Sequence, residues 1–236
     1  MNLYQTEHTL LSSDVDALRR LRLSTLFALL QEAAIAHTTA LGMGREKTLD
    51  RGLLWIITLQ QAAVFRLPAY DERITLLSWP QKTMHLYFPR CSRILDREGK
   101  TLVEASALWA LMDKNTRKIV FPEQYGIRID GASAPSDPPL PRAPRPFEPQ
   151  KTDIFTVPYS YTDLNGHMNN TRYFDLAEDR MPPALRERPI RTVQTEFGAE
   201  ARAGEAVTLQ SAATDTAFSL SGETDRRVFR LLLTYA

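Results

Sequence analysis

Residues 24–41, STLFALLQEAAIAHTTAL, and the strand patterns that follow them decide the fold. The apolar side chains of this stretch recur near the 3.6-residue period of a helix, and Gly42 is a natural stop. They are Leu26, Phe27, Leu30, Ala33, Ala34 and Leu41. Strands are predicted at LLWIITLQQAAVFR (53–66), RITLLSW (73–79), TMHLYFPRCSRIL (83–95), TLVEASALWALM (101–112) and TRKIVF (116–121). One long helix followed by consecutive antiparallel strands predicts an α+β fold, with the helix packed on the sheet.

The same order of elements occurs twice. A short strand at residues 3–9 precedes the first helix, and a strand at 154–161 precedes a second helix, predicted at 168–180. Further strands are predicted at TVQTEFGAE (192–200), EAVTLQSAA (205–213), AFSLS (217–221) and RVFRLLLTY (227–235). The run from Glu72 to Leu76 matches the run from Glu205 to Leu209, and Asp14-Val15-Asp16 matches Asp163-Leu164-Asn165. This repeat predicts a duplicated unit whose two copies pair their sheets as a symmetric dimer would.

A proline-rich stretch separates the two copies. Seven of the fifteen prolines fall in residues 131–150, GASAPSDPPLPRAPRPFEPQ. Proline fixes φ and donates no hydrogen bond, so this stretch is expected to be extended and semi-rigid. The sequence therefore predicts an N-terminal unit at 1–130, a linker at 131–150 and a C-terminal unit at 151–236.

Composition excludes several classes of function. The formal net charge of the 236 residues is +1, so no overall field favours nucleic acid or a membrane surface. No apolar stretch is long enough to span a bilayer, and MNLYQTEHTL has no signal-peptide pattern. A single cysteine, Cys91, fits a reducing compartment, and a cytoplasmic location is expected. The chain has no CxxC, HExxH, GxxxxGK[ST], GxGxxG or GxSxG motif, so neither a metal nor a cofactor is expected.

The densest polar cluster is YTDLNGHMNNTRYF, residues 161–174. Asp163, Asn165 and His167 alternate along a segment expected to be extended, so the three side chains are predicted to point the same way. The second helix is predicted to begin directly after, so the amides near 166–169 are expected to receive a developing negative charge. For Asp163 and Asn165 taken singly, a role in a turn or a helix cap is the better interpretation, but it explains the whole polar set less well.

The repeat brings a further residue into the candidate site. Matched at Glu72 and Glu205, it places Glu200 opposite Leu67. Matched at Asp14 and Asp163, it places Asn165 opposite Asp16 and His167 opposite Leu18. One copy thus has titratable side chains where the other has apolar ones. This pattern indicates that the second copy reacts and the first copy binds.

The motif Asp163-x-Asn165-x-His167-x-Asn169-Asn170-x-x-Tyr173 resembles D-x-N-x-H-x-N-N-x-x-Y of the fatty acyl-ACP thioesterases of plants and bacteria. First-half landmarks resemble the same family in order: Trp55, Arg66-Leu67-Pro68, Ser78-Trp79-Pro80, Arg90, Gly99, Ser106 and Trp109. The resemblance spans nearly the whole chain. It implies a tandem hotdog fold, in which each unit is a long helix wrapped by an antiparallel sheet.

The same resemblance implies a catalytic set of Asp163, Asn165, His167 and Glu200. Plant members have a cysteine after the glutamate, and this chain has Ala201, which favours a carboxylate mechanism without a thiol. Glu200 is expected to act as base for a water or as a nucleophile. His167 would orient the water and share the proton. Asn165 would hold the carboxylate or the substrate, and Asp163 would fix the geometry of the cluster.

The implied reaction is hydrolysis of fatty acyl-acyl carrier protein thioesters, which releases free fatty acid and the carrier thiol and ends chain elongation in fatty acid synthesis. The implied partner is the acylated carrier, with no nucleic acid, no membrane insertion, and a monomer or homodimer. No transit peptide precedes the motif, so a bacterial-type member is expected. The alternatives are a hotdog acyl-CoA thioesterase, a hotdog hydratase or dehydratase, and a non-catalytic acyl-binding module.

Two further expectations concern the substrate. The carrier is acidic, so arginines are expected to dock it, and the candidates are Arg180, Arg186, Arg188 and Arg191. The acyl tail is expected in the first unit, between its sheet and the helix residues Leu26, Leu29, Leu30 and Ala33.

Overall fold

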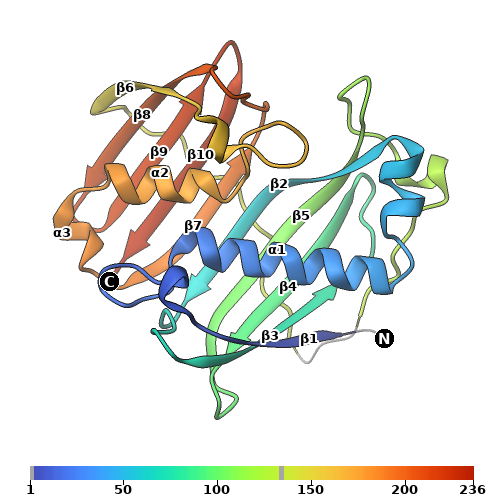
Figure 1. Cartoon of the computed structure of the whole chain (residues 1–236), viewed down its shortest axis with the longest axis horizontal. Coiled ribbons are helices and arrows are strands. Elements are labelled where there is room, and N and C mark those ends of the chain that lie inside the picture. The colour runs from blue at the N-terminus through green and yellow to red at the C-terminus, as the bar shows by residue number, and fades with distance from the viewer. Residues whose placement is uncertain (1–2, 133–135) are drawn as a thin grey trace.

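A computed structural model describes residues 3–132 and 136–236, so Pro135 of the predicted linker lies outside the described residues. The ten strands of the described residues form one antiparallel sheet in the order β1-β3-β4-β5-β2-β7-β10-β9-β8-β6 (Figure 1). The first five are β1 (Tyr4–Thr9), β2 (Leu53–Val64), β3 (Arg73–Pro80), β4 (Tyr87–Leu95) and β5 (Thr101–Asp113). The others are β6 (Lys151–Thr156), β7 (Ile190–Phe197), β8 (Ala206–Thr214), β9 (Ala217–Glu223) and β10 (Arg227–Tyr235).

The two halves of the sheet are joined by β2 and β7. Their register pairs Gln61 with Gln194, and the Gln194 side-chain amide donates to Gln61 Oε1 at 3.2 Å. Outward from this seam, both halves repeat the same order of strands. The predicted duplication and the pairing of the two sheets are therefore confirmed.

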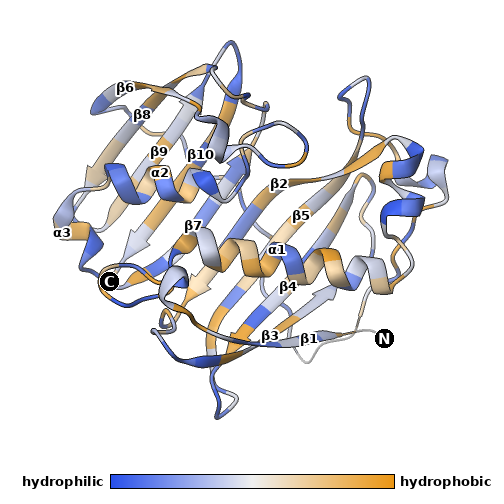
Figure 2. Ribbon diagram, viewed as in Figure 1, coloured by the Kyte–Doolittle hydropathy of each residue, from blue (hydrophilic) through white to orange (hydrophobic). Residues whose placement is uncertain are grey.

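Three helices are α1 (Leu23–Ala40), α2 (Arg172–Arg180) and α3 (Pro183–Arg186). Helices α1 and α2 lie on the same face of the sheet, each across its own half (Figure 1). They meet at Phe27 and Phe174, whose stacked rings have centroids 4.2 Å apart inside one continuous core. Figure 2 shows that apolar residues recur along α1, whereas α2 is mostly polar. No helix among the described residues is both long and apolar enough to cross a membrane.

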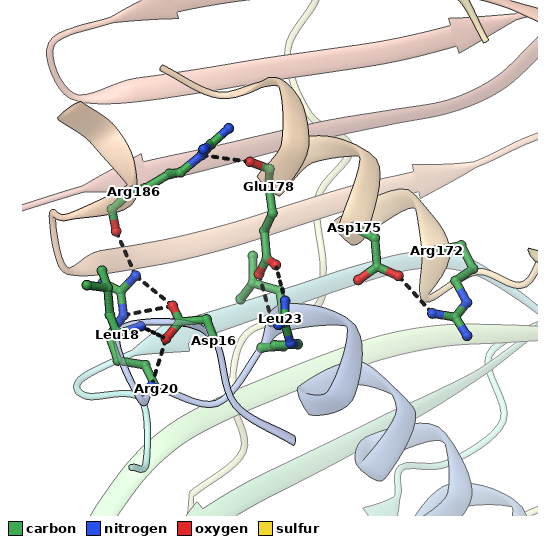
Figure 3. A network of polar contacts seen from close by, with 9 residues as sticks. Asp16, Leu18, Arg20, Leu23, Arg172, Asp175, Glu178 and Arg186 are labelled. Carbon is green, nitrogen blue, oxygen red and sulfur yellow. Dashed lines mark hydrogen bonds and ion pairs between the residues drawn. The ribbon is translucent and has the colours of Figure 1, made fainter. Parts of the chain in front are cut away.

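Polar contacts also join the halves at the start of α1 (Figure 3). The Leu23 amide donates to Glu178 Oε1 at 3.1 Å, although Glu178 belongs to α2 of the other half. The Arg20 guanidinium donates to the main-chain oxygen of Arg186 at 2.6 Å. A helix start leaves amides without an intrahelical acceptor, and here a carboxylate from the second unit accepts one of them.

Several predicted elements differ from the structure, among them the strand predicted at 83–95, which begins only at Tyr87, and the strand predicted at 192–200, which ends at Phe197. The second helix begins at Arg172, not at 168, since residues before it pair with neighbouring segments. Strand β6 ends at Thr156, and Tyr159–Tyr161 forms a 3-10 turn where 154–161 was predicted to be all strand. The predicted strand 116–121 makes only one isolated bridge, between Ile119 and Met112.

The described part of 131–150 forms no helix or strand, as its prolines predict, but it is tied to the sheet. Ser106 Oγ donates to the main-chain oxygen of Pro139 at 2.6 Å, and Arg230 donates to that of Pro144 at 3.1 Å. The division into two units with a linker stays a prediction.

Candidate active site

A cavity of about 480 Å³ lies where the two halves meet. The first half supplies the C-terminal part of α1 and the starts of β2 and β4, and the second supplies residues 163–170 and 197–200. Its apolar wall includes Ala34, Leu53, Ile57, Phe88 and Trp109, which form a cluster separate from the main core. Such a cavity can hold an apolar ligand next to polar groups of the second half.

Residues 163–167 form a tight turn instead of the predicted extended segment. Gly166 N donates to Asp163 O at 2.9 Å, and Asp163 N donates to His167 O at 2.9 Å. The Asp163 carboxylate accepts from Asn165 N at 2.8 Å, so Asp163 does have the turn role that was the alternative interpretation. Asp163, Asn165 and His167 still all line the cavity, because the turn folds back beside it.

Three of the four amides predicted to meet an oxyanion already have acceptors. Met168 N donates to Ala201 O at 2.8 Å, Asn169 N to Tyr161 O at 2.9 Å, and Gly166 N to Asp163 O. The Asn169 side chain accepts from Thr171 N at 2.9 Å. The expectation is therefore wrong for Gly166, Met168 and Asn169, which donate to other main-chain oxygens before the helix begins, and it stays a prediction for the His167 amide.

Glu200 and His167 meet as the sequence predicted. His167 Nε2 lies 3.3 Å from Glu200 Oε2, and the His167 side chain is only 13% exposed while that of Glu200 is 35% exposed. Glu200 follows the end of β7, and His167 follows the turn described above. The two ends face each other because His167 and Arg202 form an antiparallel bridge.

A residue that the sequence did not indicate completes this group. Arg117 Nε donates to Glu200 Oε2 at 3.0 Å, and its Nη2 forms an ion pair with Glu200 Oε1. Arg117 belongs to the turn after β5 of the first half, where φ is 55° and its amide donates to Asp113 O at 2.9 Å. The Glu200 carboxylate is therefore held from both halves of the chain.

The environment keeps His167 neutral over a wider pH range than a free histidine. Desolvation lowers the pKa of His167 most, the charges of Arg117 and Arg202 lower it further, and Asp163 and Glu205 oppose this. Among the described residues, Nδ1 of the ring is buried without a hydrogen-bond partner. If the neutral ring carries its proton on Nε2, which lies 3.3 Å from Glu200, then Nδ1 is an acceptor.

The backbone shows which residues of the two copies correspond. Asp16 N donates to Arg20 O at 2.8 Å, Leu21 N to Pro68 O at 2.8 Å, and Leu10 N to Glu72 O at 3.0 Å. In the second copy the same bonds join Asp163 to His167 at 2.9 Å, Met168 to Ala201 at 2.8 Å, and Val157 to Glu205 at 3.0 Å.

These bonds correct one of the two predicted matches. Asp16 corresponds to Asp163 and Arg20 to His167, so the match of Asp14 to Asp163 and Leu18 to His167 was wrong by two residues. Pro68 corresponds to Ala201, so the predicted match of Leu67 to Glu200 is confirmed.

Cys91 is 1% exposed, and burial raises the pKa of its thiol to about 12. It therefore stays a neutral thiol at ordinary pH. Cys91 is absent from the cavity wall. Among the described residues, no group of His, Cys, Asp and Glu side chains could hold a metal ion.

The four arginines predicted to dock a carrier lie away from the cavity wall. Arg180 pairs with Asp153 at 2.8 Å. Arg186 donates to main-chain oxygens at the end of α2, and Arg188 to those of Asp215 and Ala236. Three of these side chains thus already have partners within the second unit, and a docking role stays a prediction.

The fold and the cavity together define a tandem hotdog protein, in which two helix-on-sheet units share one sheet. A crystal structure of an acyl-ACP thioesterase from Bacteroides thetaiotaomicron has a TM-score of 0.85 at 22% identity and covers 99% of this chain and 98% of its own. The 12:0-ACP thioesterase from Umbellularia californica has a TM-score of 0.81 at 16% identity, with 99% and 97% covered. At these identities the likeness is one of fold, and it confirms the predicted fold class.

The chain belongs to the acyl-ACP thioesterase family. The family's N-terminal domain matches residues 1–124, and its C-terminal domain matches residues 145–232. A palmitoyl-acyl carrier protein thioesterase of Arabidopsis thaliana is 25% identical over 202 residues, which are 78% of this chain and 48% of that protein. The chain thus spans about half the length of the curated relatives it matches.

Proposed function

We propose that this protein hydrolyses fatty acyl thioesters carried on acyl carrier protein, and thereby ends chain elongation in fatty acid synthesis. The observation that carries the proposal is the contact of His167 with Glu200 at 3.3 Å on the wall of a largely apolar cavity. Family membership supplies the thioester and the carrier as the substrate class.

In the proposed reaction Glu200 acts on a water at the thioester carbonyl. The water forms a C–O bond to the carbonyl carbon, and the Glu200 carboxylate takes its proton. Collapse of the tetrahedral intermediate breaks the C–S bond, and the proton returns to the departing thiolate. The thiolate leaves without strong acid assistance, since thiol pKa values lie near 8.5. Direct attack by Glu200 through an anhydride leads to the same products after water opens it.

The other residues of the site position the reactants. His167 Nδ1, which is buried without a hydrogen-bond partner among the described residues, accepts from the attacking water. The exposed Asn165 at the cavity wall offers a side-chain amide to the carbonyl oxygen, since the backbone amides of Gly166, Met168 and Asn169 are already bonded. Asp163 holds the turn through Asn165 N.

The acyl tail is proposed to lie along the C-terminal half of α1. Ala34, Ile35 and Thr38 line the cavity there, whereas Leu26, Leu29 and Ala33 are not part of its wall. The first unit is thus proposed to bind the tail, as the sequence suggested, but with residues nearer the C-terminal end of α1 than those that the sequence indicated. A cytoplasmic location is part of the proposal and fits a single, buried, free cysteine.

A panel of acyl-ACP substrates with free-thiol detection tests the function, with acyl-CoA of equal chain length in parallel. We expect thiol release from acyl-ACP and a lower kcat/KM for the matching acyl-CoA. Purified Glu200→Gln protein is the control for contaminating esterases. Absence of thiol release from every acyl-ACP by the wild-type protein would overturn the proposal.

A further inference from the structure

Arg90 of β4 is a buried cation that the proposed reaction does not use. It is 6% exposed, and its guanidinium contacts His37 Nδ1 at 3.2 Å, Ser78 Oγ at 3.1 Å and Thr38 Oγ1 at 3.0 Å, none of which is a carboxylate oxygen. Within the described residues no carboxylate lies at ion-pair distance from it, and none of the other five residues is acidic by sequence. Arginine is rarely fully buried unless it is paired with an anion.

Arg90 lies on the cavity wall and also on that of a small pocket beside it, which has room for about one water. The polar residues lining this pocket are Gln31, Gln60, Arg90, Ser92 and Ser106. Trp109 and Ala34 line both spaces, so the polar pocket continues the apolar cavity.

Arg90 is remote from the reacting end. It pairs across the sheet with Ala107, whereas Arg117, which holds Glu200, follows Asp113 at the end of the same strand β5. Ala107 and Asp113 are six residue steps apart along the strand, which corresponds to roughly 20 Å at about 3.4 Å per residue. A chain whose thioester lies at Glu200 therefore approaches Arg90 with its distal end.

The positive charge of Arg90 determines which chemical group is favoured at the distal end of the acyl chain. An alkyl terminus against the guanidinium removes solvent and returns no hydrogen bond, which disfavours the complex. A carboxylate offers two acceptors to a planar donor fork and neutralises the charge. We infer that Arg90 forms a binding subsite for a carboxylate at the distal end of the acyl chain, so that substrates include half-thioesters of dicarboxylic acids. This inference rests on the proposed function for its thioester end only.

The test compares methyl-ended and carboxylate-ended acyl thioesters of equal length over a series of lengths. With wild-type protein, kcat/KM for the carboxylate-ended chain is expected to exceed that for the methyl-ended chain by tenfold or more at the best length. A hydrogen bond to a charged group contributes about 1.5–3 kcal/mol, which corresponds to roughly 10- to 150-fold. Arg90→Met should abolish this ratio, and Arg90→Lys should keep part of it.

Arg93→Met is the matched control, since Arg93 is on the same strand but pairs with Glu104 away from the cavity wall. It should leave the ratio unchanged. An Arg90 that only ties α1 to the sheet through Thr38 would instead lower the activity on both substrates equally. An unchanged ratio in Arg90→Met, or rejection of every carboxylate-ended chain by the wild type, overturns the inference.

A binding measurement tests the Arg90 subsite independently of the proposed hydrolysis. Calorimetry with free dicarboxylates and monocarboxylates of equal length needs no hydrolysis, and wild-type protein is expected to bind the dicarboxylate at least tenfold more tightly. This comparison also decides the case if both Arg90 variants fail to fold. Tighter binding without any thiol release would contradict the proposed function alone, and equal binding contradicts the subsite alone.

Discussion

The turns at residues 16–20 and 163–167 share their backbone hydrogen bonds and differ in what their side chains do. In the first, Arg20 closes back onto Asp16 at 2.9 Å. In the second, His167 instead reaches Glu200, and Leu67 stands at the position of Glu200 in the first copy. The turn itself is therefore a structural element that both copies share. The proposed reactivity is attributed to His167 and Glu200, whose positions Arg20 and Leu67 occupy in the first copy. It is not attributed to the turn that Asp163 holds.

The two helix starts differ in a related way. Continued into the helices, the offset between Asp16 and Asp163 places Leu23 opposite Asn170 and Gln31 opposite Glu178. On one side of the seam Glu178 caps the Leu23 amide and closes the gap between the halves. On the other side Asn170 and Gln31 both line the cavity. The contact between Glu178 and Leu23 thus closes one side of the seam. On the other side, the cavity lies at the matching pair, Gln31 and Asn170.

The largest expected effect is at the exchanged carboxylate. Glu200→Ala should lower kcat at least about 100-fold with a modest change in KM, because a general base acts in the transition state. Steady-state kinetics on an acyl-ACP substrate measure this. Glu205→Ala is the control, since Glu205 is matched by Glu72 in the first copy and caps Arg202 N at 2.8 Å. Near-normal turnover by folded Glu200→Ala would refute the assignment.

Arg117 tests whether the first copy contributes to the reacting group. Arg117→Gln removes the charged contacts to Glu200 and is expected to lower kcat/KM by roughly 10- to 100-fold, in line with about 1.5–3 kcal/mol for a hydrogen bond between charged groups. Arg117→Lys should recover part of the loss. Lys118→Gln, one residue further along, should have little effect.

The pH profile separates positioning from mere stability. Desolvation and the charge of Arg117 both lower the pKa of His167. The wild-type enzyme is therefore expected to lose activity only at comparatively low pH, where the His167 ring becomes protonated. Without Arg117 the pKa of His167 rises, and the acid limb of kcat/KM should move to higher pH. A lower rate with an unmoved acid limb would mean that Arg117 has only a structural role.

Neighbouring alanines of α1 test the division of labour between the copies. Ala34 lines the cavity, whereas Ala33 packs in the main core, and they are 3% and 4% exposed. Ala34→Phe should shift the preferred acyl chain to shorter lengths. Two methylenes lost from the pocket correspond to about 1.6 kcal/mol, or roughly fifteenfold in selectivity.

Ala33→Phe adds the same volume where no cavity exists, so it should destabilise the protein without changing the chain-length profile. Melting temperatures and kcat/KM over a series of chain lengths measure both outcomes. A folded Ala34→Phe protein with the wild-type profile would show that the tail lies elsewhere.

Sequence patterns predicted the repeat and most of the strands, because periodicity and a duplicated order of elements are local signals. The resemblance to the thioesterase family implied that Glu200 and His167 belong to one site. The match of Asp14 to Asp163 failed, since two aspartates two residues apart fit the same short motif and only hydrogen bonds separate them. The helix start at 168 failed for a related reason. Met168 and Asn169 donate to Ala201 and Tyr161, and sequence spacing does not show such partners.

Arg117 could not be predicted from the sequence around Glu200. It lies 83 residues earlier and on the other copy, and it reaches Glu200 only because β2 and β7 join the sheets. The local signal was the turn DKNTRK, which predicted a change of direction but no target for the side chain. The charge of Arg90, which has no carboxylate at ion-pair distance among the described residues, was equally hidden, because burial and the lack of an anionic partner are properties of the packed structure.

The smallest expected effect concerns the contact that closes one side of the seam. Burial raises the pKa of Glu178 most, and the hydrogen bond from Leu23 opposes this. A carboxyl whose folded pKa is raised stabilises the fold most below its unfolded pKa of about 4.3, and this contribution is lost as the pH rises through the folded pKa. Glu178→Gln removes that dependence and keeps an acceptor, so at pH 8 it should melt at or above the wild-type temperature.

Glu178→Ala leaves the Leu23 amide without its acceptor and should cost about 1 kcal/mol, or roughly 2–4 °C in Tm for a chain of this size. Gln31→Ala, at the matching position on the open side, should change Tm by less than this because it caps no amide among the described residues. Equal melting losses for Glu178→Ala and Gln31→Ala would show that the two sides of the seam do not differ in this way.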